Sequence, residues 1–523
     1  MKSFGISNIR LFIKNNAKSL VFATCLMVLN AVFLCINFKT NDLNFGKTFI
    51  FILFLSIILE IIFCIFIYVS KEKNWKTEKI FLVLGLLIGI FYVFALPPGR
   101  APDEASHFYR IYELSNGHFV SDISEDGIIG TMEPSSIELL NDYAKNNVTY
   151  SDLIDNLGIR ANEEEQSFVH TSAYSYNIIS YLPHTIGMLI GKMFNLPILV
   201  TAYISKIFNL VTCIFILYFC IKYIPILKKT VFFLAFLPIT MQAMASLSPD
   251  GLTTVMSISL ISFVLYTIYS KRKKLSAKQL TLLFIICLCL SMCKIAYAPL
   301  CLLLFAIPRE RFGSPKNKLI TIMGFGLIIS LILFSWLLIA PSIQSAYDST
   351  AQTKLILSDP FKYLAILIHS ISTNATLYLF GLLGGHLEWF DVNLSSVYIL
   401  SAFAIFVLLC NKEIKNITTT KTLKTLSILI FTIITILTFT TMFIQWTKVG
   451  EIIIDGVQGR YFLPIALLIP IWFIPTKQTA GENQSCLLTK KQLSAQLTQN
   501  YYLYAFMIFE SIYAITTIAC SHL

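Results

Sequence analysis

Residues 102–110 carry the side chains best suited to acid–base chemistry. The proline at the start suits the first turn of a helix, and the two acids after it suit the positive end of that helix. Helical spacing places Asp103, His107 and Arg110 on one face, with Glu104 adjacent to His107. Such a carboxylate can take a proton from a hydroxyl group while the guanidinium binds a phosphate. The spacing fits equally well a capped helix whose charges are only solvated.

Other charged residues stand beside or inside long apolar runs. Asp250 follows a proline in a very short turn, where an aspartate is usually a helix cap. Arg460 opens an apolar segment after a glycine, and Lys294 interrupts another. Either cation could bind a phosphate, although interfacial anchoring or snorkelling explains the same positions. Glu60 lies deep in an apolar run, where it is a functional residue, packs against another helix, or is protonated.

The elements that must position these residues are membrane spans. Of 523 residues, 56% are hydrophobic and only 13% are charged, a composition outside the range of soluble globular proteins. Apolar runs of roughly 17 to 25 residues recur, each long enough to cross about 30 Å as a helix. They predict an all-α, polytopic integral membrane protein with about 13 transmembrane helices.

The distribution of charge predicts the orientation of the chain. The net charge is +11, but the basic residues gather in short loops between spans, which indicates orientation and not nucleic-acid binding. Residues 97–172 form the one long hydrophilic stretch and contain fourteen acidic residues against four basic ones. By the positive-inside rule this loop is extracytoplasmic and the N-terminus cytoplasmic. We therefore expect a multi-pass protein of the cell membrane.

The apolar stretch 174–194 looks like a span but contains a proline, an asparagine, a histidine and a lysine. If it crossed the membrane, the basic run 271–274 would lie outside. We therefore expect an amphipathic helix along the outer interface. The same reasoning requires 361–380 to pair with another membrane segment or to lie at the interface. His170 and Tyr174, just before or at the start of the first stretch, belong to an aromatic belt or contact a substrate.

These patterns divide the chain into three regions. Residues 1–79 are an N-terminal membrane segment with two extra spans. Residues 80–475 are the transmembrane module that holds the candidate residues other than Glu60, with the extracytoplasmic loop and juxtamembrane helices at 97–197. Residues 476–523 are predicted to form a cytoplasmic loop and a C-terminal span. The sequence contains no visible internal repeat.

The order of these features resembles the GT-C superfamily of polyprenyl-phosphate-sugar-dependent membrane glycosyltransferases. Residues 102–110, 248–250, 294–297 and 456–461 are also similar to a bacterial membrane-protein family of unknown function grouped with that superfamily. The resemblance implies a GT-C-like fold over 80–475, with the acidic pair of the first extracytoplasmic loop at the catalytic centre.

By the same resemblance, Asp103 would be the catalytic carboxylate, Glu104 its partner and Asp250 the second-loop carboxylate. The resemblance implies no certain cofactor; in members that use a divalent cation, Mg²⁺ or Mn²⁺, these three residues would hold it. The residues expected to bind the donor phosphate or sugar are His107, Arg110, Lys294, Arg460, Tyr461, His170 and Tyr174. The superfamily often has a lysine just before the interfacial helix. Because this chain has Phe168–His170 there, His170 or Arg110 replaces that lysine, or the donor differs.

Together these expectations describe an inverting glycosyltransferase. It would transfer a sugar from a polyprenyl-phosphate donor to a cell-envelope glycan or lipid acceptor on the outer face of the cytoplasmic membrane. A transporter or flippase of an envelope precursor is one alternative, and it predicts pseudo-symmetry and broken central helices. The other is a non-catalytic protein of envelope assembly that binds a partner through the acidic loop.

Overall fold

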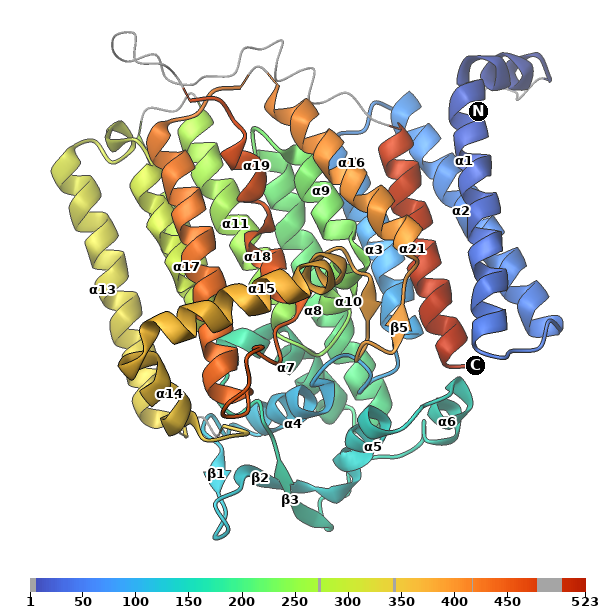
Figure 1. Cartoon of the computed structure of the whole chain (residues 1–523). Helices are drawn as coiled ribbons and strands as arrows, with labels where there is room; N and C mark the ends of the chain where they lie inside the picture. The colour runs from blue at the N-terminus through green and yellow to red at the C-terminus, as the bar shows by residue number, and fades with distance from the viewer. Residues whose placement is uncertain (1–5, 271–273, 342–344, 416, 477–500) are drawn as a thin grey trace.

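The computed structural model describes residues 6–270, 274–341, 345–415, 417–476 and 501–523, which form one bundle of helices (Figure 1). Within this part of the chain, ten helices are long and apolar enough to cross a membrane. They are α1 (Ile6–Thr40), α2 (Lys47–Glu72), α3 (Thr77–Ala95), α8 (Ile198–Tyr223), α11 (Asp250–Tyr269), α13 (Pro315–Ile339), α15 (Pro360–Leu382), α16 (Ser396–Ile414), α17 (Lys421–Gln445) and α21 (Tyr501–Ser521). The prediction of a polytopic membrane protein is confirmed, with fewer long helices than the predicted number of spans.

Further apolar segments fold as short or interrupted helices. These are α9 (Lys228–Phe236) and α10 (Pro238–Met244), α12 (Ala277–Cys293) and the 3₁₀ helix η2 (Ile295–Ala306), and η4 (Gly459–Phe462), α18 (Leu463–Ala466) and α19 (Ile469–Trp472). Prolines begin α10 and stand in the first turns of α18 and α19. A proline has no N–H to donate and disfavours a helical residue before it, so each of these helices starts afresh.

The long hydrophilic loop folds into short elements at one end of the bundle (Figure 1). They are α4 (Glu104–Ser115), β1 (Asp122–Ile123), β2 (Ile129–Pro134), η1 (Ser135–Glu138), α5 (Leu139–Lys145), α6 (Tyr150–Asp155), β3 (Gln166–His170) and α7 (Ile178–Met193). The strands form an antiparallel sheet of order β1-β2-β3, in which Gly130 pairs with His170. The all-α prediction is therefore corrected for this loop. At Gly130 a Cβ would lie 2.1 Å from the Val169 carbonyl oxygen, an approach that only glycine allows.

α7 is absent from the ten candidate spans of the described chain, in agreement with the expectation from charge. It begins at the end of α12, where Asn177 donates a 2.8 Å hydrogen bond to the Met292 carbonyl. Its last turn returns to the loop, where the Lys192 ammonium lies 3.3 Å from the Tyr112 ring centroid. α15 is long and apolar enough to span, but Figure 1 shows it running across the direction of the other helices. This arrangement agrees with the interfacial placement that the charge pattern allowed for it.

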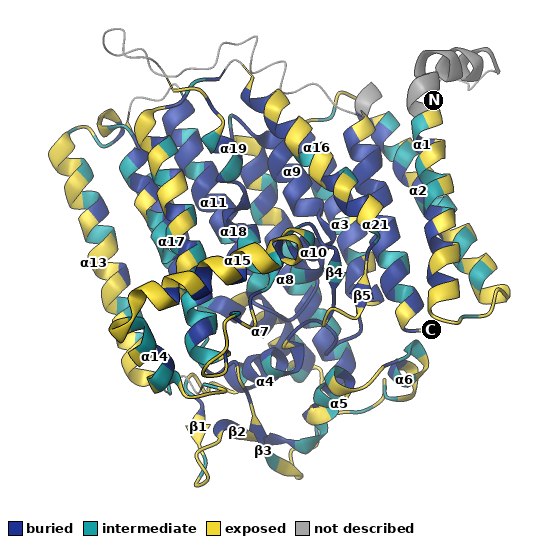
Figure 2. Cartoon of the chain, in the orientation of Figure 1, coloured by how far each residue is buried: buried dark blue, intermediate teal, exposed yellow. Residues whose placement is uncertain are grey.

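Burial separates a packed centre from a lipid-like periphery (Figure 2). α9 is buried along its whole length and α11 over most of it, whereas α13 and α15 are mostly exposed. The exposed residues of α13 are apolar, as in Leu327 and Leu338, so the natural solvent of this face is hydrocarbon. The first two helices pack on α21: Phe33 stacks on Tyr513, and Asn37 donates a hydrogen bond to Thr517 at 2.9 Å. Glu60 in α2 accepts a hydrogen bond from Asn30 in α1.

The C-terminal helix α21 is tied to the loop by a buried group of charges. Glu388 stands between Arg100, at 3.2 Å, and His522, at 2.7 Å. Arg100 also pairs with Asp391 at 2.6 Å, and the His522 carbonyl accepts a hydrogen bond from the Tyr150 amide. The predicted loop before α21 falls largely on residues 477–500, which lie outside the described residues. The remaining elements are η3 (Arg309–Arg311), α14 (Ser349–Ser358), β4 (His386–Leu387) and β5 (Val392–Asn393).

α7 approaches α8 so closely that only glycines fit at the contact. A Cβ on Gly187 would lie 2.6 Å from the Ser205 Cα, and one on Gly191 would lie 2.4 Å from the Thr201 side chain. Because the first obstacle is backbone, it cannot move aside as a side chain could. This contact fixes α7, which follows the loop, against α8, a long helix of the bundle.

We expect Gly187→Ala to lower the free energy of unfolding by about 1–3 kcal/mol, because the added methyl group overpacks a rigid contact. Gly324→Ala in α13 is the matched control, since nothing lies within 4 Å of its Cβ position. There the gain in helix propensity predicts a change between zero and about 1 kcal/mol of stabilisation. Denaturant unfolding in detergent micelles measures both, and equal effects of the two substitutions would contradict the close α7–α8 contact.

Candidate functional site

The turn before α4 is held by the carboxylate of Glu104, which is fully buried. It accepts hydrogen bonds from the backbone N–H groups of Gly99, at 2.9 Å, and Ala101, at 3.0 Å. A third comes from the Leu247 N–H at 2.9 Å, and the Lys206 ammonium lies 3.1 Å away. Both oxygens are therefore engaged by the protein, and Glu104 anchors the turn rather than facing a substrate.

Asp103, the residue before it, has the opposite environment. Its side chain is 47% exposed, and its backbone is left-handed with φ 59°. For a residue other than glycine this conformation costs roughly 1–2 kcal/mol, less for aspartate than for most. The bonds to Glu104 and the start of α4 hold it there. The turn therefore buries the Glu104 carboxylate and leaves the Asp103 carboxylate half exposed.

Four side chains of alternating charge form a row at this point, which we call the charge row: Asp103, Arg460, Asp250 and Lys294. Arg460 lies 3.8 Å from Asp103 and 3.5 Å from Asp250, and Lys294 lies 3.6 Å from Asp250. Each separation exceeds that of a strong charge-assisted hydrogen bond. The buried Nε of Arg460 has no hydrogen-bond partner among the described residues, so the guanidinium keeps donor capacity for an anion.

Aromatic rings line the charge row. The Tyr461 ring lies 4.6 Å from the Lys294 ammonium and 5.4 Å from the Arg460 guanidinium carbon, within the range of cation–π attraction. The Tyr297 hydroxyl donates a 2.8 Å hydrogen bond to the Tyr461 carbonyl oxygen, which ties η2 to η4. The Tyr181 hydroxyl lies 2.6 Å from Nδ1 of His107. The row therefore has rigid walls on the sides formed by α4, α7, η2 and η4.

Electrostatics set the protonation of His107 and Asp103, two titratable groups of the loop that lie at the charge row. Burial lowers the pKa of His107 to about 3, against the opposing effect of Asp250, so the imidazole is neutral near pH 7. Partial burial raises the pKa of Asp103, Arg460 lowers it, and the negative charge of Asp250 raises it. Asp103 is therefore the exposed carboxylate whose basicity is increased, and Arg460 limits that increase.

Two predicted ligands, Arg110 and His170, are engaged by other parts of the loop. The Arg110 guanidinium is fully buried and binds Glu113 at 2.5 Å, together with the backbone carbonyls of Phe119 and Tyr176 at 2.7 and 3.0 Å. These contacts fold the loop and use the donors that the sequence assigned to a phosphate. His170 lies on β3, where Nδ1 is 2.8 Å from the Ile129 carbonyl oxygen. Tyr174 is buried.

The structure thus brings together Asp103, Asp250, Lys294, Arg460 and Tyr461, with His107 beside them. It adds Lys206 and Tyr297, which the sequence reading missed. A lysine inside the apolar run of α8 was the signal for Lys206, because such a charge needs a buried partner. Within the described residues no group of three or more histidine, cysteine or acidic side chains could hold a metal ion. The Arg460 guanidinium lies between the carboxylates of Asp103 and Asp250.

Comparison with known proteins gives one match. A family model described as Predicted membrane protein (DUF2142) matches residues 86–469, well over half of the chain. The matched part includes all four residues of the charge row as well as Glu104 and Lys206. No curated protein and no solved structure matches the chain.

Lys206→Met should lower the free energy of unfolding by about 3–5 kcal/mol, because it leaves the Glu104 carboxylate buried without its cation. Arg309→Met is the control: this exposed cation pairs with Glu310 at 3.2 Å, and its removal should cost less than about 1 kcal/mol. The double variant Lys206→Met with Glu104→Gln should lose less than the sum of the two single losses. Additive losses in denaturant unfolding would show that the two groups do not act as a pair.

Proposed function

We propose that this chain, which belongs to the DUF2142 family of predicted membrane proteins, is an inverting glycosyltransferase of the GT-C type. In this proposal it transfers a sugar from a polyprenyl-phosphate donor to an envelope glycan or lipid on the outer face of the cytoplasmic membrane. The observation that carries the proposal is the charge row, in which an accessible carboxylate stands beside cations at the end of an apolar bundle.

Arg460 and Lys294 suit the donor phosphate. The guanidinium matches the geometry of phosphate oxygens, and Lys294 adds a point charge on the far side of Asp250. Both side chains are mostly buried, 12% and 25% exposed, so their attraction for an anion is screened less than on an open surface. The exposed apolar faces of α13 and α15 offer a hydrocarbon setting for a polyprenyl chain.

Asp103 suits the role of general base. In the proposed reaction its carboxylate takes the proton of the acceptor hydroxyl, and the acceptor oxygen forms a bond to the anomeric carbon. The bond from that carbon to the phosphate oxygen breaks on the opposite face, so the configuration inverts. The negative charge that develops on the departing polyprenyl phosphate is stabilised by Arg460 and Lys294.

Asp250 and Glu104 then act as positioning residues. Asp250 lies between both cations and holds them at one place, and Glu104 fixes the turn that presents Asp103. Arg110, which the sequence placed among the phosphate ligands, supports the loop fold instead. Any donor or acceptor contact of His170 and Tyr174 stays a prediction.

A transporter or flippase of an envelope precursor is the second candidate, and one observation favours it. The helices around the charge row are interrupted. α12 ends just before Lys294, and the segment of η4, α18 and α19 is broken at its prolines. Broken helices that carry charges are typical of transporter sites. The two functions differ in what Asp103 must do, since a base is needed for transfer and not for movement of a lipid.

Asp103→Asn should abolish transfer, because the amide cannot accept the proton; we expect kcat to fall by at least about 100-fold. The readout is the surface glycans of a deletion strain carrying wild type, Asp103→Asn or Asp126→Asn. The last removes an exposed carboxylate from the same loop and should restore the glycans. Equal membrane levels by immunoblot exclude a defect of insertion. Undiminished glycans with Asp103→Asn would sink the enzyme proposal, whereas unchanged glycans in the deletion strain would favour a non-catalytic protein.

The rate should fall on the acid side as Asp103 becomes protonated, at a pH above that expected for an ordinary aspartate because burial raises its pKa. Arg460 lowers that pKa, so Arg460→Gln should move the acid limb to higher pH in addition to raising KM. Lys145→Gln removes an exposed cation of the loop and should leave the limb in place. A pH profile of the transfer rate in membranes tests this, and an unmoved limb in Arg460→Gln would argue against Asp103 as the base.

A further inference from the structure

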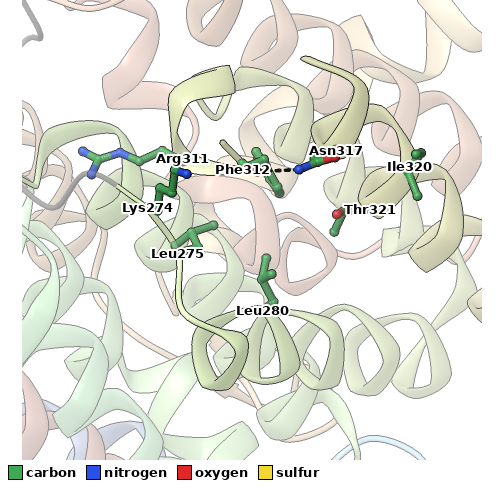
Figure 3. A pocket seen from close by; sticks show the side chains of 8 residues that line it. All are labelled: Lys274, Leu275, Leu280, Arg311, Phe312, Asn317, Ile320 and Thr321. Carbon is green, nitrogen blue, oxygen red and sulfur yellow. Dashed lines mark hydrogen bonds between the residues drawn. The ribbon is translucent and has the colours of Figure 1, made fainter. Parts of the chain in front are cut away.

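A cavity of about 250 Å³ lies at the end of the bundle opposite the loop, between the starts of α12 and α13 (Figure 3). Its lining is amphiphilic. Lys274, Asn317 and Thr321 supply polar atoms, and Leu280 and Ile320 supply an apolar wall. This cavity is separate from the charge row, which stands at the other end of the bundle.

Lys274 is the cation that serves the cavity. Its ammonium lies over the turn at Gly313, 3.4 Å from where a Cβ would stand, which is van der Waals contact. The φ of Gly313 is +90°, a backbone conformation that favours glycine. The neighbouring Arg311 instead donates a hydrogen bond to the Ser270 carbonyl, and Figure 3 shows its guanidinium turned away from the other labelled side chains. Among the described residues, Lys274 has no ion-pair partner.

The surroundings add positive charge with little to neutralise it. Residues 274–278 and 309–318 contain six basic side chains and one acidic side chain, Glu310. Glu310 pairs with Arg309 at 3.2 Å. The cavity therefore lies in a positive field that favours an anion.

An apolar surface continues from the cavity along the bundle. Ile320, which lines the cavity, is 59% exposed, and Met323 one turn further along α13 is also 59% exposed. On α12, Leu282 and Ile285 are exposed in the same way, at 50% and 47%. A ligand that fits both features carries an anionic head and long hydrocarbon chains.

We propose that this cavity binds the headgroup of an anionic phospholipid, with its acyl chains along α12 and α13. Basic pockets between membrane helices suit such headgroups, because a phosphate gains charge-assisted hydrogen bonds while the chains stay in hydrocarbon. The Thr321 hydroxyl and the Asn317 side chain, whose amide nitrogen donates a long 3.5 Å hydrogen bond to the Phe312 carbonyl, also line the cavity. The site is independent of the proposed transferase reaction.

Native mass spectrometry of the purified, delipidated full chain tests this, with phosphatidylglycerol and phosphatidylcholine of identical acyl chains as probes. We expect one phosphatidylglycerol to bind about tenfold more tightly than phosphatidylcholine. Both lipids carry a phosphate, but the positive field of the cavity repels the choline ammonium. Lys274→Gln should remove this preference. Leu280→Trp, which fills the cavity without changing charge, should weaken binding as well.

Lys278→Gln is the matched control, because Lys278 is exposed on α12 and does not line the cavity. It should keep the full preference for phosphatidylglycerol. Equal affinity of wild type for both lipids, or equal losses in Lys274→Gln and Lys278→Gln, would overturn the proposal. Complete displacement of the lipid by millimolar inorganic phosphate would overturn the choice of a lipid and identify a site for free anions.

Discussion

The pair of Glu104 and Lys206 is the interaction on which the site depends. Two charges without access to solvent each cost several kcal/mol to bury, and their attraction offsets this only if the remaining donors and acceptors are satisfied. Here Glu104 takes three backbone N–H groups, and Lys206 also donates to the Leu96 carbonyl at 3.1 Å. The pair therefore joins the end of α3, the start of α4, the N-terminal part of α8 and the turn before α11. The position of Asp103 in the charge row depends on these contacts.

The charge row exists because its residues stand at helix ends. Asp103 precedes α4, Asp250 begins α11, Lys294 separates α12 from η2, and Arg460 lies in the short η4. A continuous helix satisfies its own backbone in hydrocarbon and has little space for charges, whereas an interruption frees polar groups that must be paired inside the protein. The interruptions therefore supply both the room and the polar setting that four charges need.

Hydropathy and charge predicted the membrane class, the one long loop and the behaviour of the 174–194 stretch, because these depend on composition along the chain. They could not separate Glu104 from Asp103, which are adjacent and chemically alike, since their difference comes from Lys206 and Leu247 far away in sequence. They also could not separate Arg110 from Arg460. The Arg110 guanidinium binds Glu113 and backbone carbonyls, whereas the Arg460 guanidinium lies between two aspartates. The loop sheet and the interrupted helices were missed because apolar runs do not reveal where tertiary contacts replace a helix.

The balance of the charge row constrains how an anion can enter it. Two carboxylates already accompany the two cations, so a phosphate gains most when a cation exchanges partners. Arg460 holds Asp103 at 3.8 Å, a looser contact than a bidentate pair, and Asp103 is the more exposed of its two carboxylates. In the proposed reaction, donor binding therefore takes from Asp103 the cation that lowers its pKa, and the base becomes stronger when the donor is in place.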